Sequence, residues 1–331
     1  MENSTADFLA SCSRIDFGPV NLSEEEKEFS RELNREMLLL CKSLPKSTQT
    51  EAALFLLRYL RVSLSDGVNF IRYFYAPAWS ILYWLMKSNP GETRLDQMDM
   101  QNAKTGHTMA MFLHAIDDHL TDRQVPVTHL TLLLRSQSWM VMNYAFSKLA
   151  TAVDGGTEIV DHFIDDYYWS IYNTDGVESL DSYCGLFRKQ MATALIVPVL
   201  VAKRKTADEE FVRSIRAAYE SFGIAWRLLD DIQDMEKDMT RGVCSSVYTC
   251  LPDEIRKGWN RAKDEQADGN DDCAGRVLNY VLSNGIIDRI RQRICSELES
   301  AASIADSCSI SGLADELRCL LKPLRNGQNR S

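Results

Sequence analysis

The most informative segment of this sequence is an apolar run that ends in regularly spaced carboxylates. It reads Phe222-Gly-Ile-Ala-Trp-Arg-Leu-Leu-Asp-Asp-Ile-Gln-Asp-Met-Glu-Lys-Asp238. The run predicts a long helix with a buried face. Spacing by four places Asp230, Asp234 and Asp238 on one helical face, where exposed like charges repel by roughly 0.2–0.5 kcal/mol per pair. A bound cation would remove this cost, and hard carboxylate oxygens suit Mg²⁺.

A second segment, earlier in the chain, has the same construction. Met109-Ala-Met-Phe-Leu-His-Ala-Ile leads into Asp117-Asp-His-Leu-Thr-Asp122. Asp118 and Asp122 form the i,i+4 pair, and Asp117 is turned aside by about 100°. One such cluster in an acidic chain is more often a solvated helix end. Two clusters that both follow apolar helices instead favour two helices that face each other across one end of a bundle, with an apolar pocket beneath.

Composition supports a large helical protein. The 331 residues are 45% hydrophobic and 25% charged, which excludes disordered, collagen-like and disulfide-scaffold chains, and 16 Gly and 8 Pro are too few for a turn-rich β fold. A formal charge of −10 gives no basic footprint for nucleic acid. The nine cysteines include no Cys-x-x-Cys pair, which argues against a zinc site and a disulfide framework.

The chain is predicted to form a single all-α domain over residues 1–331, a bundle of roughly ten helices. The first helix begins at the capping box Ser23-Glu-Glu-Glu26, so 1–22 and 325–331 are expected to be flexible tails. Further helical patterns cover 51–63, 70–86, 98–121, 128–152, 159–172, 179–201 and 206–235, the last beginning at the box Thr206-Ala-Asp-Glu209. The Asp165-Asp166 and Asp271-Asp272 pairs are interpreted as surface charge.

The amino terminus has no basic region followed by an apolar stretch, so it does not have the pattern of a signal peptide. The longest strongly apolar run, 194–202, contains Pro198 and is about half the length needed to span a bilayer. We therefore expect a cytoplasmic protein without a transmembrane segment.

These segments resemble the motifs of the class I isoprenoid synthases, specifically the trans-prenyltransferase (polyprenyl synthetase) branch. Residues 223–234 are similar to the family's second aspartate-rich motif, with Trp226 in place of Phe and Arg227 in place of Gln. Residues 117–122 resemble the first aspartate-rich motif, and 122–126 resemble a reduced form of the Arg-Arg-Gly-x-Pro segment that follows it, which keeps Arg123. Residues 183–190 resemble the Tyr…Lys-Thr segment whose lysine contacts diphosphate, with Gln190 in place of Thr.

The resemblance implies a helical bundle, usually a homodimer, that binds three Mg²⁺ ions and ionises an allylic prenyl diphosphate. The implied metal ligands are Asp117, Asp118, Asp122, Asp230, Asp234 and Asp238. Asp117, Asp118, Asp230 and Lys189 are the candidate catalytic residues. The candidate diphosphate contacts are Lys189, Arg188, Gln190, Arg123, Arg227 and Arg241. Trp226 and Phe222, four and eight residues before Asp230, would lie under the diphosphate, where their rings could stabilise a cation. Phe112 occupies a position that limits chain length in the family.

Three departures weaken the family's second diphosphate site, which holds isopentenyl diphosphate. Ala110 occupies a histidine position, Asp122 stands where an arginine is expected, and the early segment offers only Arg72. We therefore favour a terpene synthase that cyclises or quenches its own cation. Two alternatives stay open: a prenyltransferase that uses isopentenyl diphosphate or an unusual acceptor, and a non-catalytic partner subunit, which would be expected to have lost carboxylates.

Overall fold

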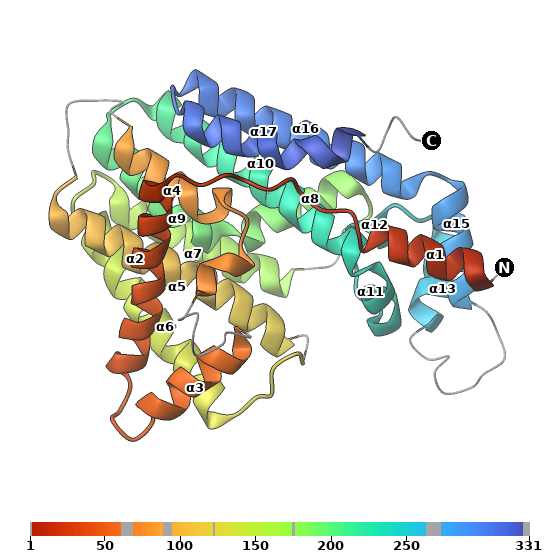
Figure 1. Cartoon of the computed structure of the whole chain (residues 1–331), viewed down its shortest axis with the longest axis horizontal. Coiled ribbons are helices and arrows are strands. Elements are labelled where there is room, and N and C mark those ends of the chain that lie inside the picture. The colour runs from red at the N-terminus through yellow and green to blue at the C-terminus, as the bar shows by residue number, and fades with distance from the viewer. Residues whose placement is uncertain are drawn as a thin grey trace.

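The computed structural model describes residues 2–60, 69–88, 95–121, 123–173, 176–262 and 273–326. All regular structure within these ranges is helical, which confirms the predicted all-α class (Figure 1). The helices are α1 (Glu2–Cys12), α2 (Glu24–Ser43), α3 (Gln49–Tyr59), η1 (Phe70–Tyr73), α4 (Pro77–Lys87), α5 (Gln97–Thr121), α6 (His129–Ala150), α7 (Gly156–Tyr172), α8 (Leu180–Gln190), α9 (Ala192–Lys205), α10 (Glu209–Gln233), α11 (Met235–Arg241), α12 (Ser246–Thr249), α13 (Asp253–Ala262), α15 (Cys273–Ser283), α16 (Ile286–Ser307) and α17 (Ser311–Asn326).

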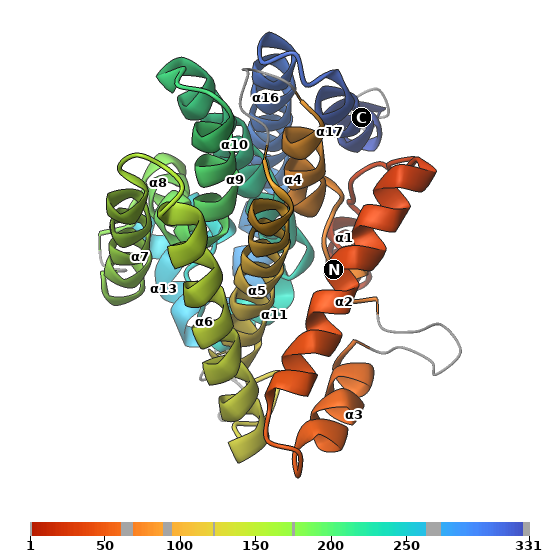
Figure 2. The same ribbon diagram turned by 90° about the vertical axis from the view of Figure 1, so that its left-hand side faces the viewer.

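Two long helices, α5 and α10, carry the two acidic segments. Helix α10 packs mainly against α16 and α9, and α5 packs mainly against α6 and α2 (Figure 2). Both helices are therefore covered by other helices, and their buried faces contribute to one hydrophobic core. This arrangement fixes the two acidic ends relative to each other.

The described residues contain more helical segments than the expected ten, in part because two predicted helices are divided. Pro77 stands at the first turn of α4, so the 70–86 pattern separates into η1 and α4. The 206–235 pattern ends at Gln233, and α11 follows Asp234. The 179–201 pattern is bent by 64° between α8 and α9, at Met191.

The side chain of Met191, at this bend, packs against a glycine of α10. A Cβ on Gly223 would lie 2.4 Å from the Met191 Cε atom, so only a glycine lets the methionine pack this closely. The close approach brings the α8–α9 junction against α10, beside the carboxylate end of that helix.

The amino-terminal segment is not the flexible tail that the sequence predicts. It contains α1, which packs against α15, and then crosses to the core, where Phe17 is buried and packs its ring 4.7 Å from that of Tyr75. Tyr75 donates a hydrogen bond to Asp16, and Gln233 donates one to the Ile15 carbonyl at 2.7 Å. At the other end, α17 continues through residue 325 to Asn326, and 327–331 lie outside the described residues.

The two predicted capping boxes have different outcomes. Ser23 and Glu26 form the expected reciprocal box at α2. At α10 the cap is Asp208, which accepts from the Glu210 amide, instead of Thr206. Over the described ranges, no single helix is long and apolar enough to cross a membrane; the bent pair α8 and α9 meets the criteria of length and composition only when combined.

Candidate active site

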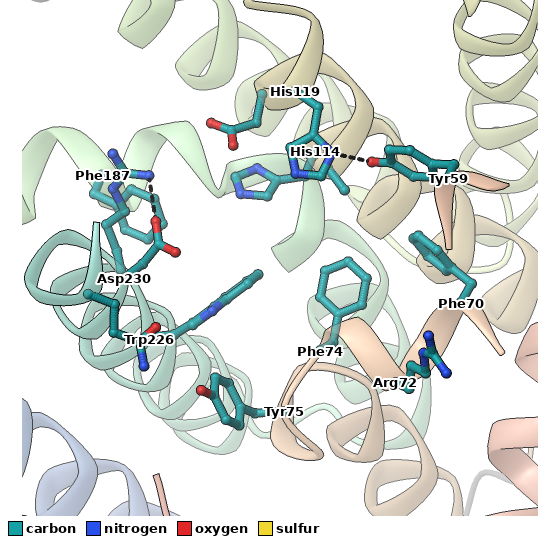
Figure 3. A pocket seen from close by; sticks show the side chains of 14 residues that line it. Tyr59, Phe70, Arg72, Phe74, Tyr75, His114, His119, Phe187, Trp226 and Asp230 are labelled. Atoms are coloured by element: carbon teal, nitrogen blue, oxygen red, sulfur yellow. Dashed lines mark hydrogen bonds and ion pairs between the residues drawn. The ribbon is translucent and has the colours of Figure 1, made fainter. Parts of the chain in front are cut away.

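A cavity of about 470 Å³ lies between the acidic ends of α5 and α10 and is closed on a third side by α3 and the η1–α4 segment (Figure 3). We call it the central cavity. It is lined by Tyr59, Phe70, Arg72, Phe74, Tyr75, His114, Ala115, Asp118, His119, Phe187, Trp226, Arg227, Asp230 and Gln233. In Figure 3, Trp226 and Asp230 face His114 and His119 across the opening. The predicted meeting of two acidic helices over an apolar space therefore corresponds to a real cavity.

Asp230 is the carboxylate of α10 that lines this cavity. Its side chain is 50% exposed, and Arg227 lies 3.5 Å away. Burial, reinforced by the charges of the neighbouring carboxylates including Asp118, raises the pKa of Asp230 to about 6 against the opposing effect of Arg227. Burial is thus the main cause of the raised pKa, and the neighbouring carboxylates add to it.

The other two carboxylates of this series are not on one continuous helix with Asp230. Asp234 stands between α10 and α11 and pairs with Lys237 at 2.6 Å. Asp238 is buried, and burial followed by the charges of Asp231, Asp230 and Asp234 raises its pKa to about 8. The three carboxylates therefore do not lie on one continuous helix as expected, because α10 ends before Asp234. Their charges still affect one another's pKa values.

Arg227 forms ion pairs with carboxylates of its own helix. Its Nε lies 3.1 Å from the completely buried Asp231 and donates to the Tyr183 hydroxyl at 2.9 Å. Although burial opposes the charge, Tyr183, Asp231 and Asp230 outweigh it and raise the pKa of Arg227. Asp231 also accepts from the Ser246 amide at 2.8 Å, which ties α12 to this end of α10.

The first acidic segment divides between two cavities. Asp118 is exposed and lines the central cavity. It also lines a neighbouring cavity of about 500 Å³, which we call the side cavity. The side cavity is lined by His114, Asp117, Asp118, Leu120, Thr121, Arg135, Tyr167, Ile171, Phe187, Gln190 and Arg227. Asp117 faces only this side cavity, where Arg135 binds it through two hydrogen bonds. Asp122 lies outside the described residues.

Most of the predicted cations lie away from both cavities. Lys189 lies 3.1 Å from Asp166 and 4.1 Å from the centre of the Trp169 ring, so Asp166 is not simple surface charge. Arg188 lies on another side of α8, 3.8 Å from Glu220 and 4.0 Å from Glu297. Arg123, which has φ of 58°, and Arg241 are exposed. Gln190 does line the side cavity.

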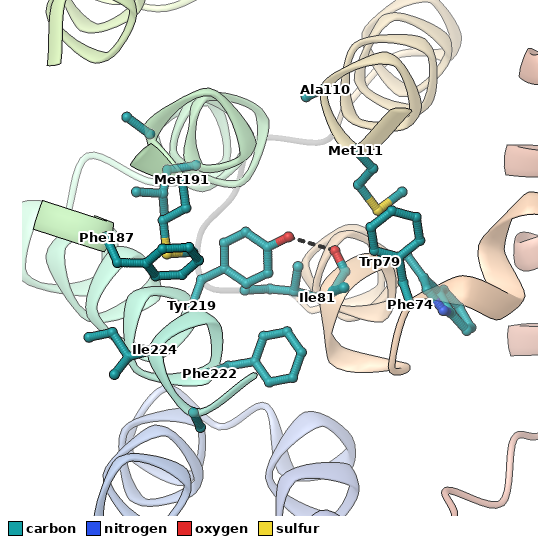
Figure 4. Packing of buried hydrophobic residues seen from close by; sticks show 14 of the residues in the cluster. Phe74, Trp79, Ile81, Ala110, Met111, Phe187, Met191, Tyr219, Phe222 and Ile224 are labelled. Atoms are coloured by element: carbon teal, nitrogen blue, oxygen red, sulfur yellow. Dashed lines mark hydrogen bonds between the residues drawn. The ribbon is translucent and has the colours of Figure 1, made fainter. Parts of the chain in front are cut away.

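Aromatic rings form the floor beneath the central cavity. Trp226 lines the cavity itself, with its ring 5.7 Å from that of Phe74. Phe222 lines a narrow apolar extension of about 30 Å³ together with Met191 and Tyr219 (Figure 4). Phe112 is fully buried and lies behind Phe70, at 5.6 Å between ring centres, so it supports the wall without lining it.

Several residues of the site escaped the sequence reasoning, among them His114 and Arg135. His114 lines both cavities and the apolar extension, and burial lowers its pKa. Its position four residues before Asp118 on one helix was a usable signal. Arg135 is on the next helix, and no motif marks it.

The donor set suits a divalent cation in part. Hard carboxylates from two helices line one cavity. Within the described ranges, no group of three Asp, Glu, His or Cys side chains could hold a metal ion alone. Phosphate oxygens and water would complete the coordination, as Mg²⁺ commonly requires.

The arrangement of helices around this cavity is similar to the fold of solved prenyl diphosphate synthases. This confirms the resemblance at the level of the fold. Solved structures of prenyl diphosphate synthases match most of the chain at 10–15% identity.

Geranylgeranyl pyrophosphate synthetase from Pyrococcus horikoshii Ot3 matches with a TM-score of 0.58 and 12% identity, over 91% of this chain and 99% of that one. Polyprenyl synthase from Caulobacter crescentus CB15, complexed with calcium and isoprenyl diphosphate, matches with a TM-score of 0.62 and 12% identity over 94% and 96%. Geranylgeranyl pyrophosphate synthase from Corynebacterium glutamicum, complexed with isoprenyl diphosphate and magnesium, gives 0.54 and 14% over 88% and 98%. No protein-family model and no curated protein matches the sequence.

Proposed function

We propose that this protein is a divalent-metal-dependent enzyme that ionises an allylic prenyl diphosphate, releases diphosphate and lets the cation cyclise or be quenched in the central cavity. The observation that carries the proposal is the position of Asp118 and Asp230 on two helices that line one aromatic-walled cavity. The similarity to solved structures with bound isoprenyl diphosphate supports the substrate class.

The metal would be held by Asp118 and Asp230, with Asp117, Asp122, Asp234 and Asp238 as further candidate ligands. When bound, Mg²⁺ would neutralise the charge that develops on the diphosphate oxygen as the carbon–oxygen bond breaks. Trp226, Phe74 and Phe187 turn aromatic surface toward the cavity, and each ring could stabilise a nearby cation by roughly 0.5–2 kcal/mol. The enclosing walls also limit the access of water to the cation.

Cyclisation is favoured over condensation with isopentenyl diphosphate because the cavity offers few cations for a second diphosphate. Among the described residues that line the central cavity, the arginines are Arg72 and Arg227. Arg227 is held by two carboxylates, and Arg72 donates to the Leu60 carbonyl at 2.8 Å. Condensation is the second candidate, because the similar solved structures are prenyl diphosphate synthases. The expected homodimer and cytoplasmic location stay predictions.

The proposal is tested by carboxylate variants. Asp118→Ala and Asp230→Ala should each lower diphosphate release by about a hundredfold or more, a loss typical of removing one charge-stabilising group, with the helical circular dichroism signal retained. Asp165→Ala is the control, because Asp165 is exposed and lines neither cavity. Full activity in excess chelator, or in the Asp230→Ala variant, would refute the metal assignment.

A further inference from the structure

Asp117 and Arg135 form a paired contact in the wall of the side cavity. Arg135 donates from Nε to Oδ1 and from Nη2 to Oδ2 of Asp117, each at 2.9 Å, and the Tyr167 hydroxyl donates to Oδ2 at 3.4 Å. Both side chains line the side cavity, where that of Arg135 is 30% exposed and that of Asp117 is 23% exposed. A partly exposed pair of this kind can open without a large change in the fold.

The guanidinium of Arg135 also lies near an aromatic ring. The guanidinium carbon lies 5.7 Å from the centre of the Trp139 ring, which belongs to the same helix, and Trp139 packs against Tyr168 of α7. In the described part of the chain, three arginines line the two cavities: Arg72, Arg135 and Arg227. Arg227 contacts Asp230, Asp231 and Tyr183, whereas Arg135 forms its ion pair with Asp117.

We propose that Arg135 is a diphosphate-binding residue that exchanges partners: it neutralises Asp117 in the ligand-free protein and moves to the diphosphate when a divalent cation takes Asp117. This inference rests on the proposed function. A cation held by Asp117 would repel the guanidinium, and a diphosphate would offer paired oxygens, which match the planar fork of arginine.

Binding of Mg²⁺ and inorganic pyrophosphate, measured by calorimetry without turnover, tests the exchange. The variants are Arg135→Gln, which removes the mobile charge, and Asp117→Asn, which releases Arg135 but keeps the shape of its partner. Arg204→Gln is the matched control, because Arg204 is also 30% exposed and pairs with a carboxylate, Asp99 at 3.2 Å, away from both cavities.

The exchange predicts effects of opposite sign. Arg135→Gln should bind pyrophosphate at saturating Mg²⁺ about ten- to a hundredfold more weakly, the range for losing a charge-assisted hydrogen bond. The same variant should bind Mg²⁺ alone about two- to fivefold more tightly, because a partly exposed ion pair no longer competes for the carboxylate. Asp117→Asn should bind pyrophosphate alone more tightly than the wild type, and Arg204→Gln should match the wild type throughout.

Three results would overturn the inference. Unchanged pyrophosphate affinity in Arg135→Gln would show that Arg135 does not contact the diphosphate. Weaker binding of both Mg²⁺ and pyrophosphate in Arg135→Gln, with no gain in Asp117→Asn, would assign Arg135 a purely structural role. A wild-type protein that binds no pyrophosphate even at saturating Mg²⁺ would overturn the proposed function itself, a failure that is visible before any variant is compared.

Discussion

Replacing Arg227 by methionine should destabilise the protein before any substrate is considered. The change keeps most of the side-chain volume and removes the positive charge that lies 3.1 Å from Asp231, whose side chain is completely buried and also accepts from the Ser246 amide. Removing one partner of a buried ion pair costs about 3–5 kcal/mol. At about 2.1 cal/mol/K per residue, a chain of 331 residues unfolds with an entropy of about 0.7 kcal/mol/K, so the melting temperature should fall by about 4–7 °C.

The assay is thermal unfolding followed by far-ultraviolet circular dichroism, without metal or substrate. Arg213→Met is the control, because Arg213 pairs with Glu210 on the exposed start of α10, and its loss should change stability by less than about 0.5 kcal/mol. Adding Asp231→Asn to Arg227→Met should restore at least half of the lost stability, since the uncompensated charge is removed. A melting temperature within about 1 °C of the wild type, or a double variant whose loss equals the sum of the single losses, would refute this reasoning.

Four further predictions follow from the same contacts. Burial lowers the pKa of His107 from 6.5 to about 4, so the folded state favours the neutral ring. The free energy of unfolding should therefore fall by about 3 kcal/mol as the pH decreases from about 6.5 to about 4. Urea titrations of His107→Phe should lack this decrease; an equally steep one would contradict the assignment. Trp226→Leu should change the product mixture, resolved by gas chromatography, more than the rate of diphosphate release, and equal losses in both would count against a role after ionisation. Met191→Ala enlarges the apolar extension and should raise the relative rate with longer allylic diphosphates. Gly223→Ala adds a methyl group against Met191 and should lower that relative rate. Identical substrate preferences in both variants would exclude Met191 as a determinant of substrate chain length. Deleting residues 2–18 removes the partners of Tyr75 and Gln233, which line the central cavity, and should raise the KM for the allylic diphosphate; an unchanged KM would show that this wall forms without the segment.

The long buried helices were predictable from the sequence, and the breaks in them were not. The 98–121 pattern corresponds closely to α5 because its apolar face continues to the acidic end. At the bend, Met191 packs against Gly223, which is distant in sequence. Helix α1 was missed for a similar reason, because it packs against α15 near the other end of the chain. Local patterns carry no information about such partners.

The site shows the same division. Spacing and apolar context were enough to bring Asp118 and Asp230 to one cavity. Arg135 reaches Asp117 only because α5 and α6 pack against each other in one register, and Lys189 is turned to Asp166 by the packing of α7 on α8. A sequence shows which lysines and arginines lie close to a motif along the chain, but not which carboxylates pair with them. The ion pairs of Arg135 and Lys189 could therefore be identified only from the structure.

The most direct test of the central claim is diphosphate release by the purified wild-type protein from geranyl, farnesyl and geranylgeranyl diphosphates, in Mg²⁺ and in excess chelator, with and without labelled isopentenyl diphosphate. We predict that at least one allylic diphosphate, given alone with Mg²⁺, yields diphosphate and a hydrocarbon or alcohol, that the chelator abolishes release, and that no label enters the product. Release from none of the three in Mg²⁺, or equal release in the chelator, would contradict metal-dependent ionisation, and efficient incorporation of label into a longer prenyl diphosphate would replace cyclisation with chain elongation.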